Sequence, residues 1–530
     1  MTINNSARIC TVVCEQHACD LPQAITRATE VADITELRLD CLIDVSPDRV
    51  FEACADLLQR AARPVIVTLR SPEEGGRQTI ERSRRLEFWR SEIRRLMSFK
   101  EVFVDIEADI IRDLSGQEEL SGAIDWRRVI CSYHDFAGMP AEVSRIYDDL
   151  AATPAGILKI AARADDATDC IPIFRLLERA RGEGREMIAI AMDAAGIATR
   201  ILGPSMGAFL TYGSLGSGPA TAPGQVSARE LSELYRIREI NSKTPVFSLL
   251  GNPVSHSISP HIHNAAFSSR GINAVYFPSE VHNAGEFIRR MVHPRSKEVG
   301  WNLRGLSVTA PHKSSVMQQL DWIEPAAKEI GAVNTIVVAE DALLGYNTDA
   351  EAFIAPLQRA LGPLANVSCA IIGAGGAACT ALWSLQRAGA QATLFARDPE
   401  AAGPLAQRFG VDCRALPEAS FEGFEVVVNA TPLGTIGEHQ NEPVVLAAQL
   451  RGVRLVYDLV YNPTETLLLQ EAARAGCACM GGLEMLVLQA AAQFKLWTGE
   501  DAPLSVMREA ATLALDRQQQ TYRQQSQLRI

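Results

Sequence analysis

The first 215 residues repeat one pattern eight times: a short apolar run typical of a buried strand, followed in most cases by an amphipathic stretch. The runs are Ile9–Val13, Ile34–Leu39, Pro64–Leu69, Val102–Ile106, Val129–Tyr133, Gly156–Ile160, Met187–Met192 and Gly207–Tyr212. Strands that alternate with helices form parallel sheets, and eight repeats in about 220 residues predict a (β/α)8 barrel. An open doubly wound sheet is the alternative.

Reactive polar side chains lie at or just beyond the carboxyl ends of many of these runs. They are Glu36, Arg38, Arg70, Asp105, His134, Lys159 and Arg200. In a barrel these ends open on one mouth, where such enzymes do their chemistry. An amine removed from water, as Lys159 would be in its apolar run, is a usable nucleophile for a carbonyl group. Each residue alone has a structural explanation, but together they favour Schiff-base chemistry with His134 as acid or base.

The second half follows a polar junction at Asn241–Pro245 and carries a dinucleotide-binding pattern. An apolar strand in Ala370–Ala378 runs into a glycine-rich turn and a helix, the context in which a pyrophosphate approaches a helix N-terminus. The next strand ends at Arg397, which suits a ribose 2′-phosphate, beside Asp398, which would suit NAD. The sequence therefore predicts NADP, with NAD as the alternative.

Composition narrows the functional class. The chain has 51 Lys and Arg against 63 Asp and Glu, and the net charge of −12 argues against a nucleic-acid-binding surface. The 12 Cys show no metal or redox spacing, so we expect buried or unpaired thiols, a reducing compartment and no metal site. The start lacks a signal-peptide core, and no apolar run reaches the length of a membrane span. We expect a soluble, cytoplasmic protein without membrane or nucleic-acid partners.

The first half resembles the type I 3-dehydroquinate dehydratases. The matching pieces are Glu36–Asp40, Thr68–Arg70 with Glu74–Gly76, Ser132–Phe136, Lys159, Arg200 and Ala222–Gln225. The resemblance implies that Lys159 forms an imine with the substrate ketone, that His134 transfers protons and that Glu74 orients His134. The implied substrate ligands are Arg200 for the carboxylate and Glu36, Arg38, Arg70, Thr221 and Gln225 for the ring hydroxyls. Thr221 departs from the Ser common in the family but keeps the hydroxyl, and no metal is implied.

The second half resembles shikimate dehydrogenase, through Gly251–Pro260, Val308–Lys313, Gly331–Thr335 and Gly345–Asp349. The resemblance implies a catalytic dyad of Lys313 and Asp349. The implied substrate ligands are Ser257, Ser259 and Tyr461 for the carboxylate and Thr309, Asn334, Asp349 and Gln489 for the ring hydroxyls. The implied cofactor contacts are Gly373, Ala374, Gly375, Gly376, Ala377, Arg397, Asn429, Thr431, Leu459, Gly482 and Met485.

Together the two resemblances imply a fusion of consecutive steps, from 3-dehydroquinate through 3-dehydroshikimate to shikimate with NADP. We expect a barrel in 1–240, a substrate-binding domain in 245–350, a Rossmann-like domain in 351–500 and a C-terminal helix or tail in 501–530, as a monomer or homodimer. The alternatives are a quinate-preferring dehydrogenase that uses NAD, a non-catalytic metabolite sensor and a Schiff-base aldolase barrel. The sensor should have lost its catalytic groups, and the aldolase leaves Glu74–Gly76 and Ala222–Gln225 unexplained.

Overall fold

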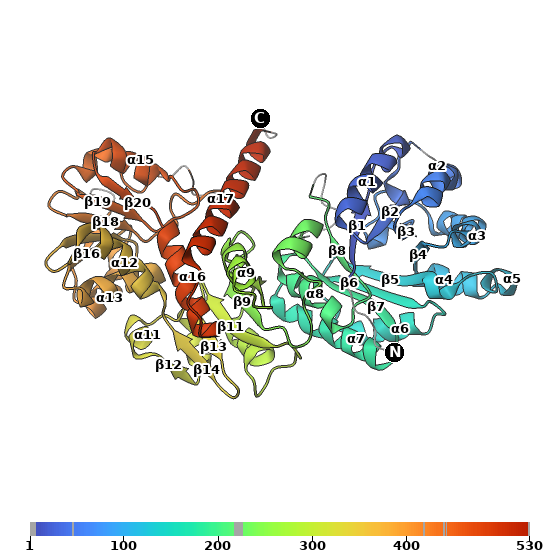
Figure 1. Ribbon diagram of the computed structural model, residues 1–530, viewed down its shortest axis with the longest axis horizontal. Coiled ribbons are helices and arrows are strands. Elements are labelled where there is room, and N and C mark those ends of the chain that lie inside the picture. Colours follow the sequence, from blue (N-terminus) through green and yellow to red (C-terminus); the bar gives the residue numbers. More distant parts are fainter. Residues whose placement is uncertain are drawn as a thin grey trace. The chain divides into compact units, whose positions relative to one another are not determined.

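The chain divides into two compact units, each of them an α/β structure (Figure 1). The computed structural model describes residues 7–44, 47–216, 226–416, 419–437, 440 and 443–527. The first unit holds Met1–Pro245, Phe277–Met291 and Lys297–Asn302. The second holds Val246–Tyr276, Val292–Ser296 and Leu303–Ile530.

The first unit is a barrel of eight parallel strands. They are β1 (Ile9–Val13), β2 (Ile34–Arg38), β3 (Val65–Thr68), β4 (Val102–Glu107), β5 (Val129–Asp135), β6 (Ile157–Arg163), β7 (Glu186–Met192) and β8 (Thr211–Gly213). Their order is β7-β6-β5-β4-β3-β2-β1-β8, and a bridge between Met187 and Ala208 joins the two edges. The predicted barrel is confirmed.

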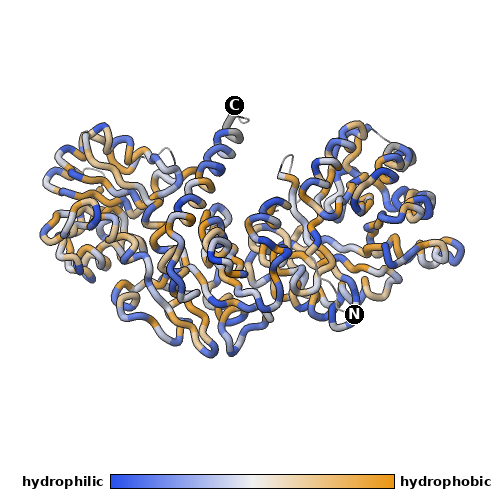
Figure 2. Tube along the Cα trace, in the orientation of Figure 1, coloured by the Kyte–Doolittle hydropathy of each residue, from blue (hydrophilic) through white to orange (hydrophobic). Residues whose placement is uncertain are grey.

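The helices of this unit follow the strands and cover the barrel. They are α1 (Leu21–Val31), α2 (Pro47–Arg60), α3 (Arg82–Ser98), α4 (Ala108–Ser115), α5 (Glu118–Ser121), α6 (Val143–Ala151), α7 (Cys170–Gly182) and α8 (Ile197–Leu202). Apolar residues concentrate along the strands (Figure 2), because both faces of a barrel strand are buried. On α4, for example, Ile110, Ile111 and Leu114 form the buried stripe of an amphipathic helix.

A disulfide joins Cys14 and Cys41, so the expectation that all the cysteines are thiols is wrong at these two positions. Cys14 directly follows β1, and Cys41 ends the turn after β2. Because β1 and β2 are neighbours in the barrel, the two Cα atoms lie 5.3 Å apart although 27 positions separate them in sequence. The other ten cysteines are free thiols.

The second unit begins with a mixed sheet. Its strands β9 (Val246–Gly251), β11 (Leu303–Val308), β13 (Thr335–Val338), β14 (Leu343–Tyr346) and β12 (Trp322–Ile323) follow one another in that order. β10 (Val275–Glu280) spans the boundary between the units. The helices of this segment that belong to the second unit are α9 (Ser259–Ser269), α11 (Pro325–Ile330) and α12 (Asp349–Leu361), whereas α10 (Ala284–Phe287) lies in the stretch Phe277–Met291 of the first unit.

A second, fully parallel sheet follows, with the order β17-β16-β15-β18-β19-β20. Its elements are β15 (Ser368–Ile372), α13 (Gly376–Arg387), β16 (Gln391–Ala396), α14 (Pro399–Phe409), β17 (Cys413–Ala415), β18 (Val426–Asn429), β19 (Leu455–Asp458), α15 (Leu467–Arg474) and β20 (Ala478–Met480). Numbered from its first strand, the order is 3-2-1-4-5-6, that of dinucleotide-binding folds. The predicted Rossmann-like sheet is confirmed.

The last two helices, α16 (Leu483–Thr498) and α17 (Leu504–Gln527), return to the mixed sheet. Phe494 on α16 and Met507 on α17 share one core with Phe247 on β9 and Phe267 on α9. α17 packs along α9 and α16 (Figure 1). Among the described helices, none combines the length and apolar character needed to cross a membrane.

The contact between α16 and β11 gives a stability prediction. A methyl group on Gly305 of β11 would collide with the indole of Trp497, which donates to the Ile336 carbonyl at 3.1 Å. We expect Gly305→Ala to lower the free energy of unfolding of this unit by about 1–3 kcal/mol in urea denaturation. Gly403→Ala on α14 is the control, because no atom lies within 4 Å of its added methyl group. Equal effects of both substitutions would contradict the packing described.

Candidate functional site

Lys159 lies on β6, and its amine is buried among three hydrogen-bond acceptors. Its Nζ atom donates to Asp105 Oδ2 at 2.7 Å, to Tyr212 Oη at 2.9 Å and to Glu36 Oε2 at 3.1 Å. The lysine is only 3% exposed. The amine is therefore buried, as the apolar run predicts, and two of the carboxylates expected at the barrel mouth, Glu36 and Asp105, contact it.

His134 at the end of β5 forms a pair with Glu74, which ends the short turn after β3. The distance between His134 Nδ1 and Glu74 Oε2 is 3.0 Å. Burial lowers the pKa of His134 well below its usual range, and the cations Arg70 and Lys159 add to the effect. Burial also raises the pKa of Glu74 to about 8, although Arg70 opposes the shift. The pair thus combines a neutral imidazole with a carboxyl group that titrates near neutral pH.

Asp105 forms ion pairs both with Lys159 and with Arg70, which lies near the His134–Glu74 pair. Its Oδ2 atom lies 2.8 Å from Arg70 Nη2, and Arg70 in turn lies 3.6 Å from Glu74. Burial opposes the ionisation of Asp105, but Arg70 and Lys159 outweigh it and hold the pKa of Asp105 well below its usual value. Asp105 is therefore a carboxylate that holds two buried cations in place.

Arg200 on α8 is a buried cation that forms no ion pair with the described residues. Its Nη1 atom donates to the Tyr212 carbonyl at 3.3 Å, and its Nε atom has no acceptor in the part of the chain that the structure describes. Burial lowers the pKa of Arg200 to about 10. Arg38, in contrast, is paired with Asp40 at 2.6 Å. Arg200 is thus available to an anionic ligand, whereas Arg38 already has a carboxylate partner.

The predicted substrate ligands Thr221 and Gln225 lie outside the described residues. The structure brings the other predicted residues of the first unit together: Lys159, His134, Glu74, Glu36, Arg38, Arg70 and Arg200.

In the second unit, Lys313 and Asp349 form an ion pair, with 2.6 Å between Lys313 Nζ and Asp349 Oδ2. Asp349 is the first residue of α12, where the helix dipole stabilises a carboxylate. Asn334 fixes the preceding turn, because its side-chain oxygen accepts from the Thr348 amide at 2.8 Å. A Cβ atom added to Gly376 would lie 3.9 Å from Lys313 Cδ. The lysine therefore lies beside the glycine-rich turn.

A chain of hydroxyls and an amide lies in the same unit. Ser257 donates to Ser259 at 3.1 Å. Burial raises the pKa of Tyr276, and its hydrogen bonds with Ser307 and Ser259 oppose the shift. Tyr276 donates to Ser307 at 2.9 Å, and Ser307 donates to the Gln493 side chain at 2.8 Å. Of the other predicted substrate ligands, Thr309 and Gln489, predicted for the ring hydroxyls, follow β11 and lie on α16, respectively, and Tyr461, predicted for the carboxylate, follows β19.

The glycine-rich turn between β15 and α13 leaves its backbone open. Gly373 has φ +107°, and a Cβ atom there would lie 2.7 Å from Thr431 Cγ2. Gly375 is the N-cap of α13, and a Cβ atom there would meet no atom within 4 Å. Ala374 lies within the turn and Ala377 in the first turn of α13. The N-terminus of α13 is thus accessible to an anionic group.

The other predicted cofactor residues lie at the carboxyl ends of neighbouring strands. Asn429 ends β18 and accepts from the Thr431 amide at 3.0 Å, and the Leu459 amide donates to the Asn429 carbonyl at 3.0 Å. Gly482 packs against the Leu459 carbonyl, where a side chain would not fit. Met485 packs on the core of the parallel sheet.

Arg397 and Asp398 follow β16 but have different surroundings. Arg397 is exposed. Asp398 is the N-cap of α14, and its Oδ1 atom accepts from the amides of Glu400 and Ala401 at 3.0 Å each. Its carboxylate is thus engaged with the helix end.

Three family models match the chain. The type I 3-dehydroquinase model covers residues 9–242, the shikimate dehydrogenase substrate binding domain covers 249–336, and the shikimate 5′-dehydrogenase C-terminal domain covers 482–512. A bifunctional 3-dehydroquinate dehydratase/shikimate dehydrogenase, chloroplastic, of Arabidopsis thaliana is 31% identical over 522 residues, which are 94% of this chain and 83% of that protein. The chain belongs to the family of bifunctional 3-dehydroquinate dehydratase/shikimate dehydrogenases.

Single-function proteins match the dehydrogenase half of this bifunctional chain. Shikimate dehydrogenase (NADP(+)) of Methanocaldococcus jannaschii is 37% identical over 281 residues, which are 51% of this chain and 97% of that protein. A crystal structure of shikimate 5-dehydrogenase from Thermus thermophilus, in complex with NADP(H) and shikimate, is 34% identical, covers 51% of this chain and 100% of its own, and has a TM-score of 0.46.

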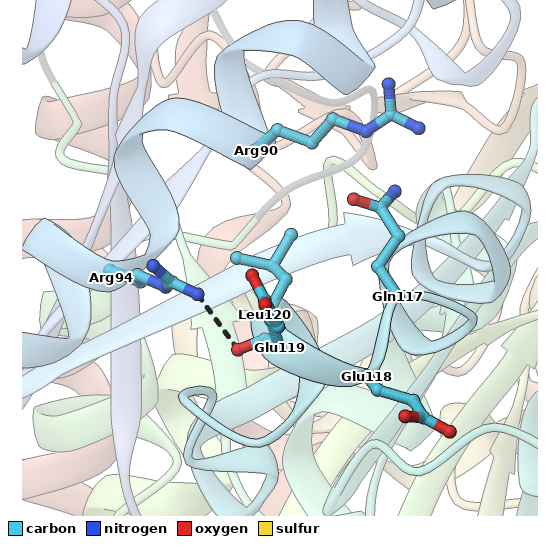
Figure 3. A pocket seen from close by; sticks show the side chains of 6 residues that line it. All are labelled: Arg90, Arg94, Gln117, Glu118, Glu119 and Leu120. Atoms are coloured by element: carbon cyan, nitrogen blue, oxygen red, sulfur yellow. Dashed lines mark hydrogen bonds between the residues drawn. The ribbon is translucent and has the colours of Figure 1, made fainter.

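The first unit of the bifunctional chain also has a surface hollow of about 550 Å³, whose lining side chains are shown in Figure 3. Its lining residues are Arg90, Arg94, Gln117, Glu118, Glu119 and Leu120. Arg94 donates to the Glu119 carbonyl at 2.8 Å. Because α3 leads into β4, the last turns of α3 lie at the amino ends of the strands, opposite the end that holds Lys159. The hollow is not part of the candidate site.

Several residues of the candidate site were not assigned from the sequence. In the first unit these are Tyr212, Arg85 and Glu107, and in the second Tyr276, Ser307 and Gln493. Glu107 could have been predicted from the sequence, because it lies two positions after Asp105 on β4 and therefore faces the same side of the strand. The described residues hold no cluster of His, Cys, Asp and Glu suited to a metal ion.

The pair of His134 and Glu74 gives a pH prediction for the dehydratase activity of the family. Below a pH of about 8, Glu74 carries a proton and donates to Nδ1, so Nε2 holds the ring proton and is not a base. Above that pH, Glu74 accepts from Nδ1 and frees Nε2. We expect kcat/KM for dehydration of 3-dehydroquinate to rise with pH through about 8.

Glu74→Gln is the matched variant for this prediction. A glutamine oxygen can accept from Nδ1 at every pH, so the rise near pH 8 should disappear in the pH profile. A wild-type profile that is flat between pH 6 and 9 would contradict the assignment.

Proposed function

We propose that the first unit dehydrates 3-dehydroquinate to 3-dehydroshikimate and that the second unit reduces this product to shikimate with NADPH. One observation carries the proposal: the chain holds a buried Lys159 beside a His134–Glu74 pair in one unit, and a Lys313–Asp349 pair beside a glycine-rich turn in the other. The first arrangement suits imine chemistry, and the second suits proton transfer coupled to a hydride step.

In the dehydratase, Lys159 attacks the substrate ketone through Nζ, and loss of water gives an imine. The imine withdraws electrons, so His134 removes a proton from the adjacent carbon, and the electron pair expels the ring hydroxyl as water with a proton from His134. Hydrolysis of the imine then releases the product and frees Lys159. Glu74 orients His134. The guanidinium of Arg200 forms no ion pair with the described residues, which supports the role of Arg200 as the carboxylate ligand.

We propose the following additional substrate ligands. Arg38, Arg70, Glu36, Thr221 and Gln225 would contact ring hydroxyls of the dehydratase substrate. In the dehydrogenase, the carboxylate would contact Ser257, Ser259 and Tyr461, and the hydroxyls Thr309, Asn334, Asp349 and Gln489.

The second unit has a site that fits NADP. The α13 N-terminus beside Gly375 is open to a pyrophosphate, and exposed Arg397 suits a 2′-phosphate. Asp398, the residue that would favour NAD, is engaged as a helix cap, which supports NADP. The nicotinamide supplies the hydride when NADPH is bound. Lys313 transfers a proton to the substrate oxygen at C3, and Asp349 holds the lysine amine in place.

We propose further that the domains are 1–240, 245–350, 351–500 and 501–530, as expected from the sequence. We also propose that the protein is cytoplasmic and a monomer or homodimer, and that it has no nucleic-acid or membrane partner. The substrates remain 3-dehydroquinate, 3-dehydroshikimate and shikimate.

Two substitutions test the assignment of the two activities to separate units. Lys159→Ala should reduce dehydration of 3-dehydroquinate by at least about 1,000-fold and leave shikimate oxidation unchanged, because the two lysines lie in different units. Lys313→Ala should have the opposite effect, with a loss of about 100-fold or more. Each activity is measured separately on the same preparation. Loss of both activities in a folded variant would contradict the proposal.

A further inference from the structure

The last strand of the barrel, β8, carries a buried tyrosine next to the proposed nucleophile. The hydroxyl of Tyr212 accepts from Lys159 Nζ at 2.9 Å and donates to Glu36 Oε2. Glu36 Oε2 also accepts from Lys159 Nζ at 3.1 Å. The amine, the phenol and the carboxylate thus form a closed triangle, with the Lys159 amine 4.5 Å from the centre of the Tyr212 ring.

The ammonium group of Lys159 is fully occupied by its three acceptors. An ammonium has three protons and no lone pair, and here the protons point to Asp105, Glu36 and Tyr212. Attack on a ketone needs a free electron pair on Nζ, so one proton has to leave the amine first. One of the three acceptors therefore has to take this proton from Lys159.

Asp105 is the more strongly engaged of the two carboxylates around the amine. It is held between Arg70 and Lys159, and these two cations keep its pKa well below its usual value. Among the described residues, Lys159 is the only ion-pair partner of Glu36. Glu36 thus has fewer cationic partners than Asp105, and Tyr212 contacts both Glu36 and the amine.

We propose that Tyr212 is a catalytic residue that relays a proton from Lys159 to Glu36 when the imine forms, and returns it when the imine is hydrolysed. The N–H bond of Lys159 breaks toward Tyr212 Oη while the O–H bond of Tyr212 breaks toward Glu36. The electron pair stays on Nζ and attacks the ketone carbon. One proton has then moved from the amine to the carboxylate, and the tyrosine is neutral before and after. The inference rests on the proposed role of Lys159.

Two features of Tyr212 support a relay. The residue is only 5% exposed, so bulk water does not compete for its hydroxyl. Burial, with the charge of Glu36 next to it, raises the pKa of Tyr212 well above its usual value. The phenol therefore keeps its proton at neutral pH and can donate it only while it accepts another. A phenylalanine would fill the same space but would interrupt this path.

The test compares wild-type protein with Tyr212→Phe in the full chain. Single-turnover reactions with 3-dehydroquinate are quenched with borohydride at increasing times, and the reduced adduct on the Lys159 peptide is measured by mass spectrometry. We expect the rate of adduct formation and kcat to fall about 100-fold, with KM changed less than threefold. Shikimate oxidation by the same preparation should be unchanged.

Tyr147→Phe is the matched control. Tyr147 on α6 is also a buried tyrosine whose hydroxyl donates to a carboxylate, that of Glu183 at 2.6 Å, but it has no contact with Lys159 among the described residues. Its loss should leave kcat and the adduct rate within twofold of wild type. An equal effect of both substitutions would mean that Tyr212 has only a packing role, which would overturn the inference.

A measurement on the wild-type protein covers the case in which Tyr212→Phe does not fold. The rate of adduct formation is recorded in mixtures of H2O and D2O. A relay moves two protons together and gives a curved dependence on the deuterium fraction, whereas direct transfer from Lys159 to Glu36 gives a straight line and overturns the inference. If wild-type protein forms no adduct on Lys159, the proposed function itself fails. If wild-type protein forms the adduct and Tyr212→Phe forms it at the same rate, only the relay is overturned.

Discussion

The ion pair between Lys159 and Asp105, 2.7 Å apart in the barrel interior, is the interaction on which the first site depends. A buried charge is destabilising by several kcal/mol unless a partner of opposite charge and good geometry lies next to it. Asp105 is such a partner for both Lys159 and Arg70, and Arg70 in turn lies near the Glu74 that holds His134. One carboxylate thus holds Lys159, the proposed nucleophile, and, through Arg70, the surroundings of the proposed acid–base pair. Among the described residues, Arg200 has no such partner, which fits its proposed role as the ligand of an anionic substrate.

The second unit uses the same pair of chemical groups in different surroundings. Lys313 and Asp349 also lie in contact, but their side chains are 24% and 9% exposed, against 4% and 0% for Lys159 and Asp105. A lysine that forms a covalent bond with its substrate benefits from exclusion of water, because water hydrolyses the imine. A lysine that only transfers a proton needs access to substrate and to a source of protons. The degree of burial therefore matches the role proposed for each lysine.

The sequence was sufficient for the fold, because strand and helix patterns repeat regularly and buried parallel strands are apolar throughout. The eighth run was the least accurate: Gly207–Tyr212 was expected, whereas β8 is Thr211–Gly213, since Gly207 adopts φ +108° and contributes to a turn. Contacts between side chains on different strands could not be predicted, because the sequence pattern describes each strand separately. The Cys14–Cys41 disulfide and the Tyr212 contact with Lys159 are of this kind, since an aromatic residue in a strand resembles ordinary core. The capping role of Asp398 could have been predicted from the sequence, because Pro399 follows it and proline is common at the first position of a helix.

If one chain performs both steps in series through an imine, purified protein should consume NADPH when it is given 3-dehydroquinate. The measurement follows NADPH absorbance before and after treatment with borohydride in the presence of 3-dehydroquinate. We expect NADPH to be consumed before treatment, and treatment to abolish consumption with 3-dehydroquinate but not with 3-dehydroshikimate. Folded protein that consumes NADPH with neither substrate would contradict the two proposed activities and favour a non-catalytic sensor, and consumption unaffected by borohydride would contradict the imine.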